Sequence, residues 1–242
     1  MNLLTIEARI NSSRLPGKVL LELDNVALIK IIVEKCKKIS FIDNLVVATT
    51  SSSKDDILCD FLTLNNIDFF RGSENDVCKR LVECSKKYQA QNLIKLTGDN
   101  PFIDINLIKE GFDIFNNLKN IDILCVCDKR SVPIGFDFEI LKTDTLIKSY
   151  SNKMSDYDKE HATTYLKKHF KKFDFFPERF ISKDFIKDVE LTIDNYEDFK
   201  FAEKIITLSK SNIFKLGIDE IQKIYLDSHI KHNSIRKWSK GI

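Results

Sequence analysis

The chain has 242 residues, a length that suits one α/β domain with a sizeable hydrophobic core. Its formal net charge of +2 argues against a general nucleic-acid binder, which would carry a strong basic excess. No apolar run approaches the roughly 20 residues that a membrane-spanning helix needs, and the first residues lack the pattern of a signal peptide. We therefore expect a cytoplasmic protein with neither a nucleic acid nor a membrane as its partner.

In the first half of the chain, strand-like and helix-like segments alternate. Strands are predicted over residues 3–8, 44–49, 68–70, 92–96 and 121–127, and helices over 27–39, 55–65, 74–89 and 105–117. Short apolar strands that alternate with helices indicate a mostly parallel sheet covered by helices on both faces. The fold class predicted from this pattern is α/β.

Beyond about residue 128 this alternation changes. A turn followed by a strand is predicted over 132–140, helices over 143–150, 159–170 and 196–210, another strand over 190–194, and helix and then a basic tail after 212. No repeat, low-complexity stretch or flexible linker marks a domain boundary. We therefore expect a single domain over residues 1–242, with an inserted arm at about 131–180.

The six cysteines form no C-x-x-C pair, and Cys125 and Cys127 alternate within an apolar, strand-like run. Alternate residues of a strand point the same way, so these two thiols are expected to pack as small hydrophobic groups. Because disulfides are rare in the cytosol, we expect reduced, buried cysteines.

The loop after the first predicted strand is rich in groups that bind phosphate. It carries three cations, two hydroxyls and a Pro-Gly turn, namely Arg9, Arg14, Lys18, Ser12, Ser13, Pro16 and Gly17. Ligands collect beyond the carboxyl ends of strands in α/β sheets, and cationic side chains and glycine-turn N–H groups pair with phosphate oxygens. The loop therefore suits a polyanion such as a nucleoside triphosphate, although a solvated basic loop would have the same composition.

Two distant acidic residues each follow an apolar run that is typical of a strand. Asp99 stands in the segment TGDNP, and Asp194 follows the run ELTI. The carboxyl ends of parallel strands share one edge of a sheet, so the two carboxylates are able to converge on one Mg²⁺ ion. Turn formation and helix capping are the alternatives for both residues. Glu197 and Asp198, in the next helical turn, are expected to stabilise the helix dipole.

The segment IEARINSSRLPGKVL resembles the N-terminal signature of the cytidylyltransferases that make CMP-activated sugars. It is most similar to the spore-coat polysaccharide cytidylyltransferases and more distantly to the 3-deoxy-manno-octulosonate cytidylyltransferases. Glu7 stands where these families more often have Gln or Pro. The segments TGDNP and TIDNYEDF resemble their metal-binding motifs, which implies that Asp99 and Asp194 are ligands of Mg²⁺.

Further segments carry the same resemblance in the expected order, among them RGSENDV, PIGFDFE and EHAT. Ser73, three residues before Asp76, also fits a helix N-cap, and a structural hydrogen bond is the alternative for His161. Together with the first loop, the segments imply nucleotide-binding residues at Ala8, Ser12, Ser13, Gly17, Thr49, Thr50, Gly72, Ser73, Asp76 and Arg80. They imply acceptor-binding residues at Gly135, Asp137, Glu139 and His161.

The resemblance implies a Rossmann-like nucleotidyltransferase fold, of the nucleotide-diphospho-sugar transferase type, whose inserted arm mediates a homodimer. It also implies Mg²⁺-dependent transfer of CMP from CTP to a sugar or sugar-acid acceptor, with release of pyrophosphate. In such a reaction Arg9, Arg14 and Lys18 would be the catalytic cations that neutralise the triphosphate. Two alternatives stay open: synthesis of an NDP-sugar from a sugar 1-phosphate, and a non-catalytic nucleotide-sugar-binding protein.

Overall fold

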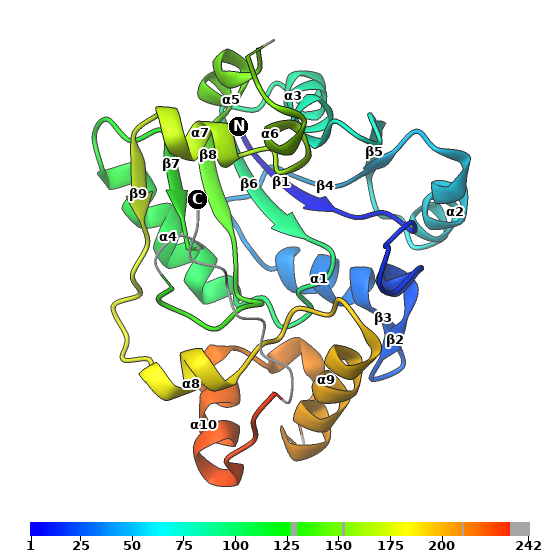
Figure 1. Cartoon of the computed structure of the whole chain (residues 1–242), viewed down its shortest axis with the longest axis vertical. Helices are drawn as coiled ribbons and strands as arrows, with labels where there is room; N and C mark the ends of the chain where they lie inside the picture. Colours follow the sequence, from blue (N-terminus) through cyan, green and yellow to red (C-terminus); the bar gives the residue numbers. More distant parts are fainter. Residues whose placement is uncertain (127–129, 152, 210, 233–242) are drawn as a thin grey trace.

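A seven-stranded sheet forms the centre of the computed structural model, which describes residues 1–126, 130–151, 153–209 and 211–232. Figure 1 shows the sheet with helices on either side. The strands lie in the order β5-β4-β1-β6-β8-β7-β9. Their bounds are Asn2–Glu7 (β1), Asn44–Thr50 (β4), Phe69–Gly72 (β5), Asn92–Thr97 (β6), Ile123–Cys125 (β7), Glu139–Lys142 (β8) and Lys172–Asp174 (β9).

The sheet is mostly parallel, as predicted. Strand β1 pairs in parallel with both β4 and β6, and β4 pairs in parallel with β5. Strand β8 runs antiparallel to both of its neighbours, β6 and β7. On β1, Leu3, Leu4 and Ile6 have no exposed surface, because helices cover both faces and a continuous apolar run is needed to fill them.

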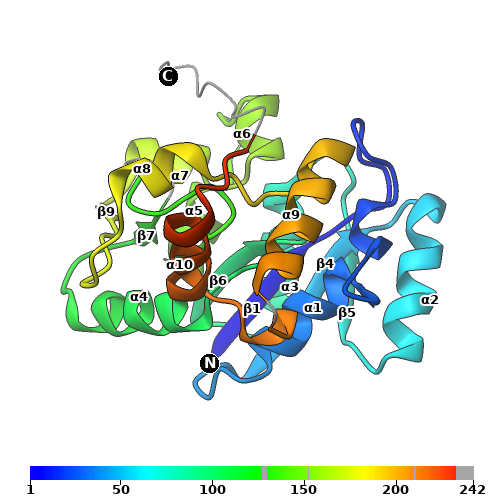
Figure 2. The same ribbon diagram turned by 90° about the horizontal axis from the view of Figure 1, so that it is seen from below.

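Two layers of helices enclose the sheet. One face is covered by α1 (Leu28–Cys36), α2 (Asp56–Leu64) and α4 (Ile105–Asn117), whose apolar residues share a core with α8 (Lys183–Asp188), α9 (Tyr196–Ser209) and α10 (Ile218–Ser228). The opposite face is covered by α3 (Val77–Lys87), α5 (Thr143–Ser149) and α7 (Thr164–His169), near α6 (Asp156–Glu160). Figure 2 shows α9 and α10 in front of the sheet on the side of α1 and α4.

Three short helices and one hairpin complete the described elements. The short helices are η1 (Lys18–Leu20), η2 (Ser53–Asp55) and η3 (Ile213–Lys215), and the hairpin joins β2 (Glu22–Leu23) to β3 (Val26–Ala27). Its turn residues Asp24 and Asn25 both have positive φ, at 57° and 59°, which is the backbone twist that a tight two-residue hairpin needs.

Two predicted elements differ from the structure. The helix predicted over 159–170 is wrong as one element, because the chain breaks around Ala162 (φ 28°) into α6 and α7. The strand predicted over 190–194 is also wrong, since only Glu190 forms a bridge, to Ile134, and the following residues are extended without a ladder. Beyond 212, η3 and α10 account for the predicted helix, and residues 233–242 of the basic tail lie outside the described residues.

The segment 131–180, where an arm is expected, contributes β8 and β9 to the central sheet as well as α5, α6 and α7. Cys125 and four other described cysteines are buried and free of disulfides, whereas Cys127 lies outside the described residues. Within the described residues, no helix is both long and apolar enough to cross a membrane.

Candidate active site

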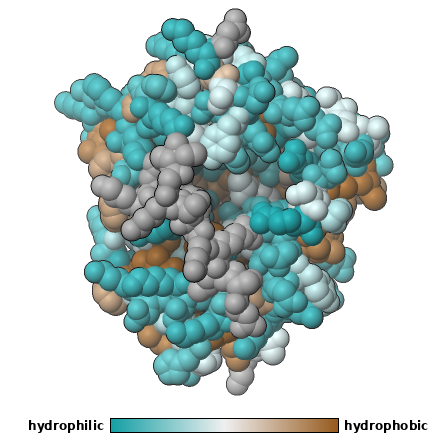
Figure 3. Space-filling view, in the orientation of Figure 1, coloured by the Kyte–Doolittle hydropathy of each residue, from teal (hydrophilic) through white to brown (hydrophobic). Residues whose placement is uncertain are grey.

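The carboxyl ends of β1 and β6 meet at a hollow in the surface. Glu7, the last residue of β1, pairs in register with Thr97, the last residue of β6, and the Gly98 N–H donates to the Glu7 carbonyl over 2.8 Å. Figure 3 shows this face hollowed near its centre with hydrophilic side chains on part of its border, and Figure 1, in the same orientation, shows β1 and β6 ending near the centre. The loop that follows each strand therefore opens into the same hollow.

The loop after β1 is held by its backbone. The Gly17 N–H donates to the Ile10 carbonyl over 2.8 Å, and the Ile10 N–H donates to Oδ1 of Asp55 over 2.6 Å. Gly17 has a φ of 74°, a conformation that favours glycine, and η1 begins directly after it. This turn directs Lys18 inward, so that only 10% of its side chain is exposed.

Lys18 joins the two distant aspartates. Its Nζ lies 2.7 Å from Oδ2 of Asp99 and 2.6 Å from Oδ1 of Asp194, and it donates to the Ile193 carbonyl over 2.9 Å. Because both oxygens contact the same Nζ, Oδ2 of Asp99 and Oδ1 of Asp194 are no farther apart than the sum of these two distances. Residues separated by most of the chain thus converge at the end of the sheet, as the sequence predicted.

Asp194 arrives there although its segment is not a strand of the sheet. The Ile193 N–H donates to the Asp99 carbonyl over 2.9 Å, and the Thr192 hydroxyl donates to Oδ1 of Asn100 over 2.7 Å. The Asn100 amide in turn donates to the Thr97 hydroxyl oxygen over 2.9 Å. The TGDNP loop therefore takes the place of a neighbouring strand and fixes the position of Asp194.

Of the other two cations of the loop, Arg14 contacts Asp194 and Arg9 lies near Arg80. One Nη of Arg14 lies 2.7 Å from Oδ2 of Asp194, although 54% of the Arg14 side chain is exposed. Arg9 is half-buried near Arg80, whose pKa is lowered by burial and by the charge of Arg9 against the opposing effect of Glu7. Ala8 is buried, Ser12 is half-buried and Ser13 is exposed along this loop.

The pair Asp99 and Asp194 fits a magnesium ion by the chemistry of its oxygens. Mg²⁺ favours one or two carboxylates, with water and phosphate oxygens completing its octahedron. The described residues include no cluster of three or more His, Cys, Asp or Glu that would form an all-protein cage. Two convergent carboxylates beside a cationic loop are the arrangement expected where a metal is shared with a phosphate chain.

The nucleotide-binding residues predicted around the end of β4 are packed and braced. Thr49 and Thr50 are fully buried, and the Thr50 hydroxyl donates to the Asp55 carboxylate. Arg71 holds this corner, since its guanidinium donates to the Thr50 and Ser52 carbonyls over 2.9 and 2.7 Å. These contacts give the strand end a fixed shape.

The start of α3 corrects one expectation. Asp76, not Ser73, is the N-cap, since Asp76 accepts from the Lys79 N–H over 2.7 Å, whereas the Ser73 hydroxyl accepts from the Asp76 N–H over 3.1 Å. Arg80, only 3% exposed, donates to the Ser73 carbonyl over 2.5 Å. A Cβ at Gly72 would lie 2.8 Å from Cγ of Arg80, so glycine is required for this approach.

The residues predicted to bind the acceptor are not gathered in one cluster. Gly135 has a φ of 108°, and its N–H donates to Asp137 over 3.1 Å. Asp137 also pairs with Arg130 at 2.6 Å and lies before β8, which begins at Glu139, although a turn and strand were predicted over 132–140. His161 is exposed at the C-cap of α6, where its ring lies 4.2 Å from that of Tyr157.

Glu139 belongs to a buried chain of alternating charges. Lys167 lies 2.5 Å from Oε1 of Glu139, Lys95 lies 3.2 Å from Oε2, and the Thr163 hydroxyl donates to both oxygens. Lys95 also lies 3.8 Å from Glu7, which is the last member of this row of charges. Burial opposes ionisation of Glu139 and Lys95, but their opposite charges prevail, so the pKa of Glu139 is lowered and that of Lys95 is raised. Burial raises the pKa of Glu7.

Sequence reasoning missed two contacts that link the C-terminal part of the chain to the site. Asp198 accepts from the Asp194 N–H over 2.8 Å and lies 3.1 Å from Nε2 of His232, with the Asp198 and His232 side chains both 2% exposed. The spacing of His232 in the sequence gives no signal of a metal site. Its partner in the structure, Asp198, lies in the first turn of α9. The Asp198 carboxylate therefore joins the backbone of Asp194 to the ring of His232, besides placing a negative charge in the first turn of α9.

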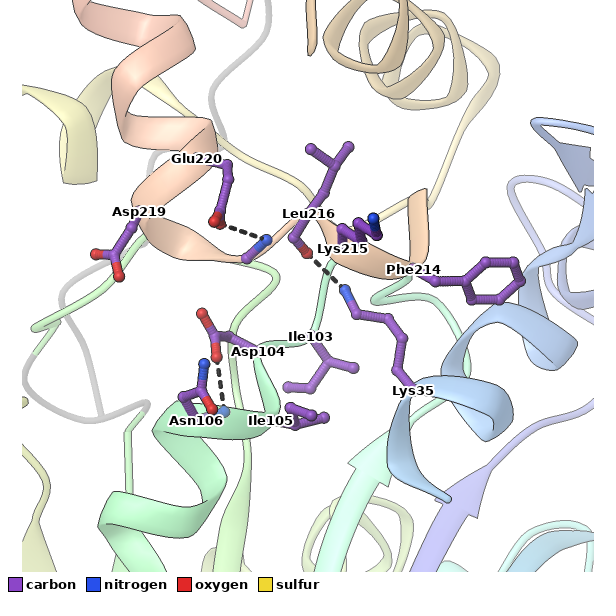
Figure 4. A pocket seen from close by; sticks show the side chains of 11 residues that line it. Lys35, Ile103, Asp104, Ile105, Asn106, Phe214, Lys215, Leu216, Asp219 and Glu220 are labelled. Carbon is purple, nitrogen blue, oxygen red and sulfur yellow. Dashed lines mark hydrogen bonds between the residues drawn. The ribbon is translucent and has the colours of Figure 1, made fainter. Parts of the chain in front are cut away.

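The second contact lies in a pocket of about 150 Å³ between α1, α4 and α10. Figure 4 shows Lys35 reaching the Leu216 carbonyl, to which its Nζ donates over 2.7 Å. The same Nζ lies 3.4 Å from the Pro101 carbonyl, so Lys35 ties the loop of Asp99 to the start of α10. Burial lowers the pKa of Lys35 to about 8.

Comparisons with known proteins point to one family. The family model described as "Cytidylyltransferase" matches residues 3–232. The spore coat polysaccharide biosynthesis protein SpsF of Bacillus subtilis is 34% identical over 211 residues, which cover 82% of this chain and 83% of that protein. The structure of a cytidylyltransferase from Leptospira borgpetersenii superimposes with a TM-score of 0.84 and 30% identity, covering 97% of each chain.

A more distant structure shares the fold alone. The CMP:2-keto-3-deoxy-manno-octonic acid synthetase complexed with CTP has a TM-score of 0.59 and 16% identity, over 85% of this chain and 98% of that chain. The chain therefore has the Rossmann-like fold of the nucleotidyltransferases.

Proposed function

The chain belongs to the cytidylyltransferase family, and from this premise we propose that it transfers CMP from CTP to a sugar or sugar acid in a Mg²⁺-dependent reaction. The observation that supports this proposal best is the convergence of Asp99 and Asp194 beside the cationic loop after β1. A triphosphate in the hollow would meet cations and carboxylates together, since Arg14 and Lys18 are paired with Asp194 and Lys18 also with Asp99.

In the proposed reaction an acceptor hydroxyl oxygen attacks the α-phosphorus of CTP in line with the bond to the β-phosphate. The new P–O bond forms as the old one breaks, pyrophosphate leaves with the electron pair, and the hydroxyl proton passes to solvent. Arg9, Arg14 and Lys18 offset the charge that develops on the phosphate oxygens, and Asp99 and Asp194 would hold the metal. A bound Mg²⁺ supplies Lewis-acid polarisation of those oxygens.

Asp99→Asn and Asp194→Asn test the proposal, because asparagine caps helices and turns about as well as aspartate but removes a negative metal ligand. We expect each variant to stay folded and to lose most pyrophosphate release from CTP and a mixed pool of acceptors. Asp43→Asn is the matched control, since Asp43 is exposed and contacts the opposite end of β1 through the Asn2 N–H. Full turnover in both site variants would refute the metal assignment.

The same assay separates the alternatives. Pyrophosphate release with CTP in preference to UTP, GTP and ATP supports the proposed function. Release with a sugar 1-phosphate as the acceptor would instead indicate an enzyme that makes NDP-sugars. Binding of nucleotide without any release would indicate a nucleotide-sugar-binding protein.

A further inference from the structure

The ammonium group of Lys18 lies where a cation shared by the two aspartates would lie. Three oxygens surround its Nζ: Oδ2 of Asp99 at 2.7 Å, Oδ1 of Asp194 at 2.6 Å and the Ile193 carbonyl at 2.9 Å. Arg14 lies 2.7 Å from the remaining oxygen of Asp194. Two of the cations assigned to the triphosphate are therefore already paired with the carboxylates assigned to the metal.

We propose that Lys18 and Arg14 exchange partners during binding, so that the metal ion and the nucleotide bind strongly only together. In this exchange the metal takes the two carboxylates, and the released side chains take phosphate oxygens of the nucleotide. The inference rests on the proposed function and adds to it a coupling between two ligands. Lys18 acts as a built-in competitor of the metal.

The charges of the site explain the coupling. Two carboxylates and two cations balance one another, so a divalent ion that enters alone meets the charges of Lys18 and Arg14 at close range. A nucleotide that enters alone must draw Lys18 and Arg14 away from two largely buried carboxylates, and the loss of these ion pairs is unfavourable. When both ligands enter, every charge regains a partner, and by linkage each ligand strengthens the binding of the other.

The two aspartates have other contacts, one through a carboxylate and one through the backbone, that keep them in place when Lys18 moves. Oδ1 of Asp99 accepts from the Thr97 hydroxyl over 2.6 Å, and the Asp194 N–H is held by Asp198 over 2.8 Å. Lys18 itself has a flexible four-carbon stem and follows Gly17, where a Cβ would meet no atom within 4 Å. The cation is therefore the movable partner and the two carboxylates are the fixed ones.

Mn²⁺ is the probe, because its free and bound forms are distinguished by electron paramagnetic resonance. In metal-free wild-type protein, α,β-methylene-CTP, which resists cleavage, should tighten Mn²⁺ binding by about tenfold or more, within the usual range for coupled sites. Lys18→Met should bind Mn²⁺ about tenfold more tightly than the wild type without nucleotide and should show less tightening on addition of the analogue. Lys54→Met, which removes an exposed lysine from η2, should match the wild type.

Two results would overturn the exchange: no synergy between Mn²⁺ and the analogue in the wild type, or equal Mn²⁺ affinity in Lys18→Met, Lys54→Met and the wild type. The synergy measurement needs no variant, so its absence overturns the exchange even if Lys18→Met misfolds. Because Mn²⁺ also binds the analogue in solution, the tightening is counted relative to the Mn²⁺ affinity of the analogue measured without protein. The double variant Lys18→Met/Asp194→Asn should lose the gain in affinity, which would assign it to the same carboxylates. If Asp99→Asn and Asp194→Asn lose turnover while no synergy is found, the proposed function stands and only the exchange fails.

Discussion

Replacing Lys95 with methionine should destabilise the fold, because Lys95 is the cation between two buried carboxylates. Its Nζ lies 3.2 Å from Glu139 and 3.8 Å from Glu7, and the side chains of Lys95, Glu139 and Glu7 are 14%, 8% and 14% exposed. Removing one partner of a buried ion pair costs about 3–5 kcal/mol. Glu139 keeps Lys167 at 2.5 Å, so the lower end applies, about 3 kcal/mol.

The loss should fall mainly on Glu7, which has no other salt-bridge partner within the described structure. Lys95→Met/Glu7→Gln should therefore be more stable than Lys95→Met alone, since it removes the carboxylate left without its cation. Urea unfolding measures both free energies, with an unchanged m-value as the sign that the denatured state is the same. A thermal midpoint lowered by about 6–12 °C in Lys95→Met would agree, at roughly 2–4 °C per kcal/mol for a chain of this size.

The pH dependence supplies an independent check on Glu7. The pKa of Glu7 in the folded protein is raised above the ordinary 4.5, so the folded state holds the proton more tightly than the unfolded state. The free energy of unfolding should therefore fall as the pH rises from 4.5 to the raised pKa. Glu7→Gln should lack this fall. A loss below about 1 kcal/mol in Lys95→Met, or a further loss on adding Glu7→Gln, would refute the reasoning.

Two further predictions concern the C-terminal half and Lys35. Phe176 and Phe180 are 54% and 83% exposed within the expected arm, so we expect the protein to be a homodimer. Light scattering at micromolar concentration should show a dimer for the wild type and a monomer for Phe176→Ser/Phe180→Ser. A monomeric wild type would refute this prediction. The pKa of Lys35 is lowered from 10.5 to about 8, so the unfolded state binds more protons in that interval and stability should rise with pH across it. Lys35→Met should lack that rise in urea midpoints, and parallel profiles for variant and wild type would contradict the assignment.

The sequence pattern predicted the buried strands and the amphipathic helices of the first half of the chain. The helix Ile105–Asn117 has its predicted bounds, and β1, β4 and β6 lie within a residue of theirs, because buried strands and amphipathic helices impose strong periodicity. The residues from Thr192 to Asp194 were predicted to belong to a strand, and they are extended but form no ladder. Their partners are the distant loop residues Asp99 and Asn100, which no local pattern can indicate.

The convergence of Asp99 and Asp194 followed from the position of each acid after an apolar run, even though only the first run is a strand of the sheet. The buried charge chain did not follow, because Glu7, Lys95 and Glu139 stand on three separate strands and meet only through strand order. His232 was equally hidden, since its burial depends on the packing of its ring against Phe201. The convergence of the two aspartates was thus more predictable than the contacts that support them.

The order in which the chain is synthesised has a consequence for the assembly of this site. Lys18 contacts Asp99 across 81 positions and Asp194 across 176. The entropy of closing such loops grows only slowly with length, so the second contact is not much harder to make than the first, but it must wait for its residues. A nascent chain that has just released β6 from the ribosome contains Lys18 but not yet Asp194. The complete set of ion pairs around Lys18 therefore forms only after residues beyond 190 have been added, so the proposed site is completed late in synthesis.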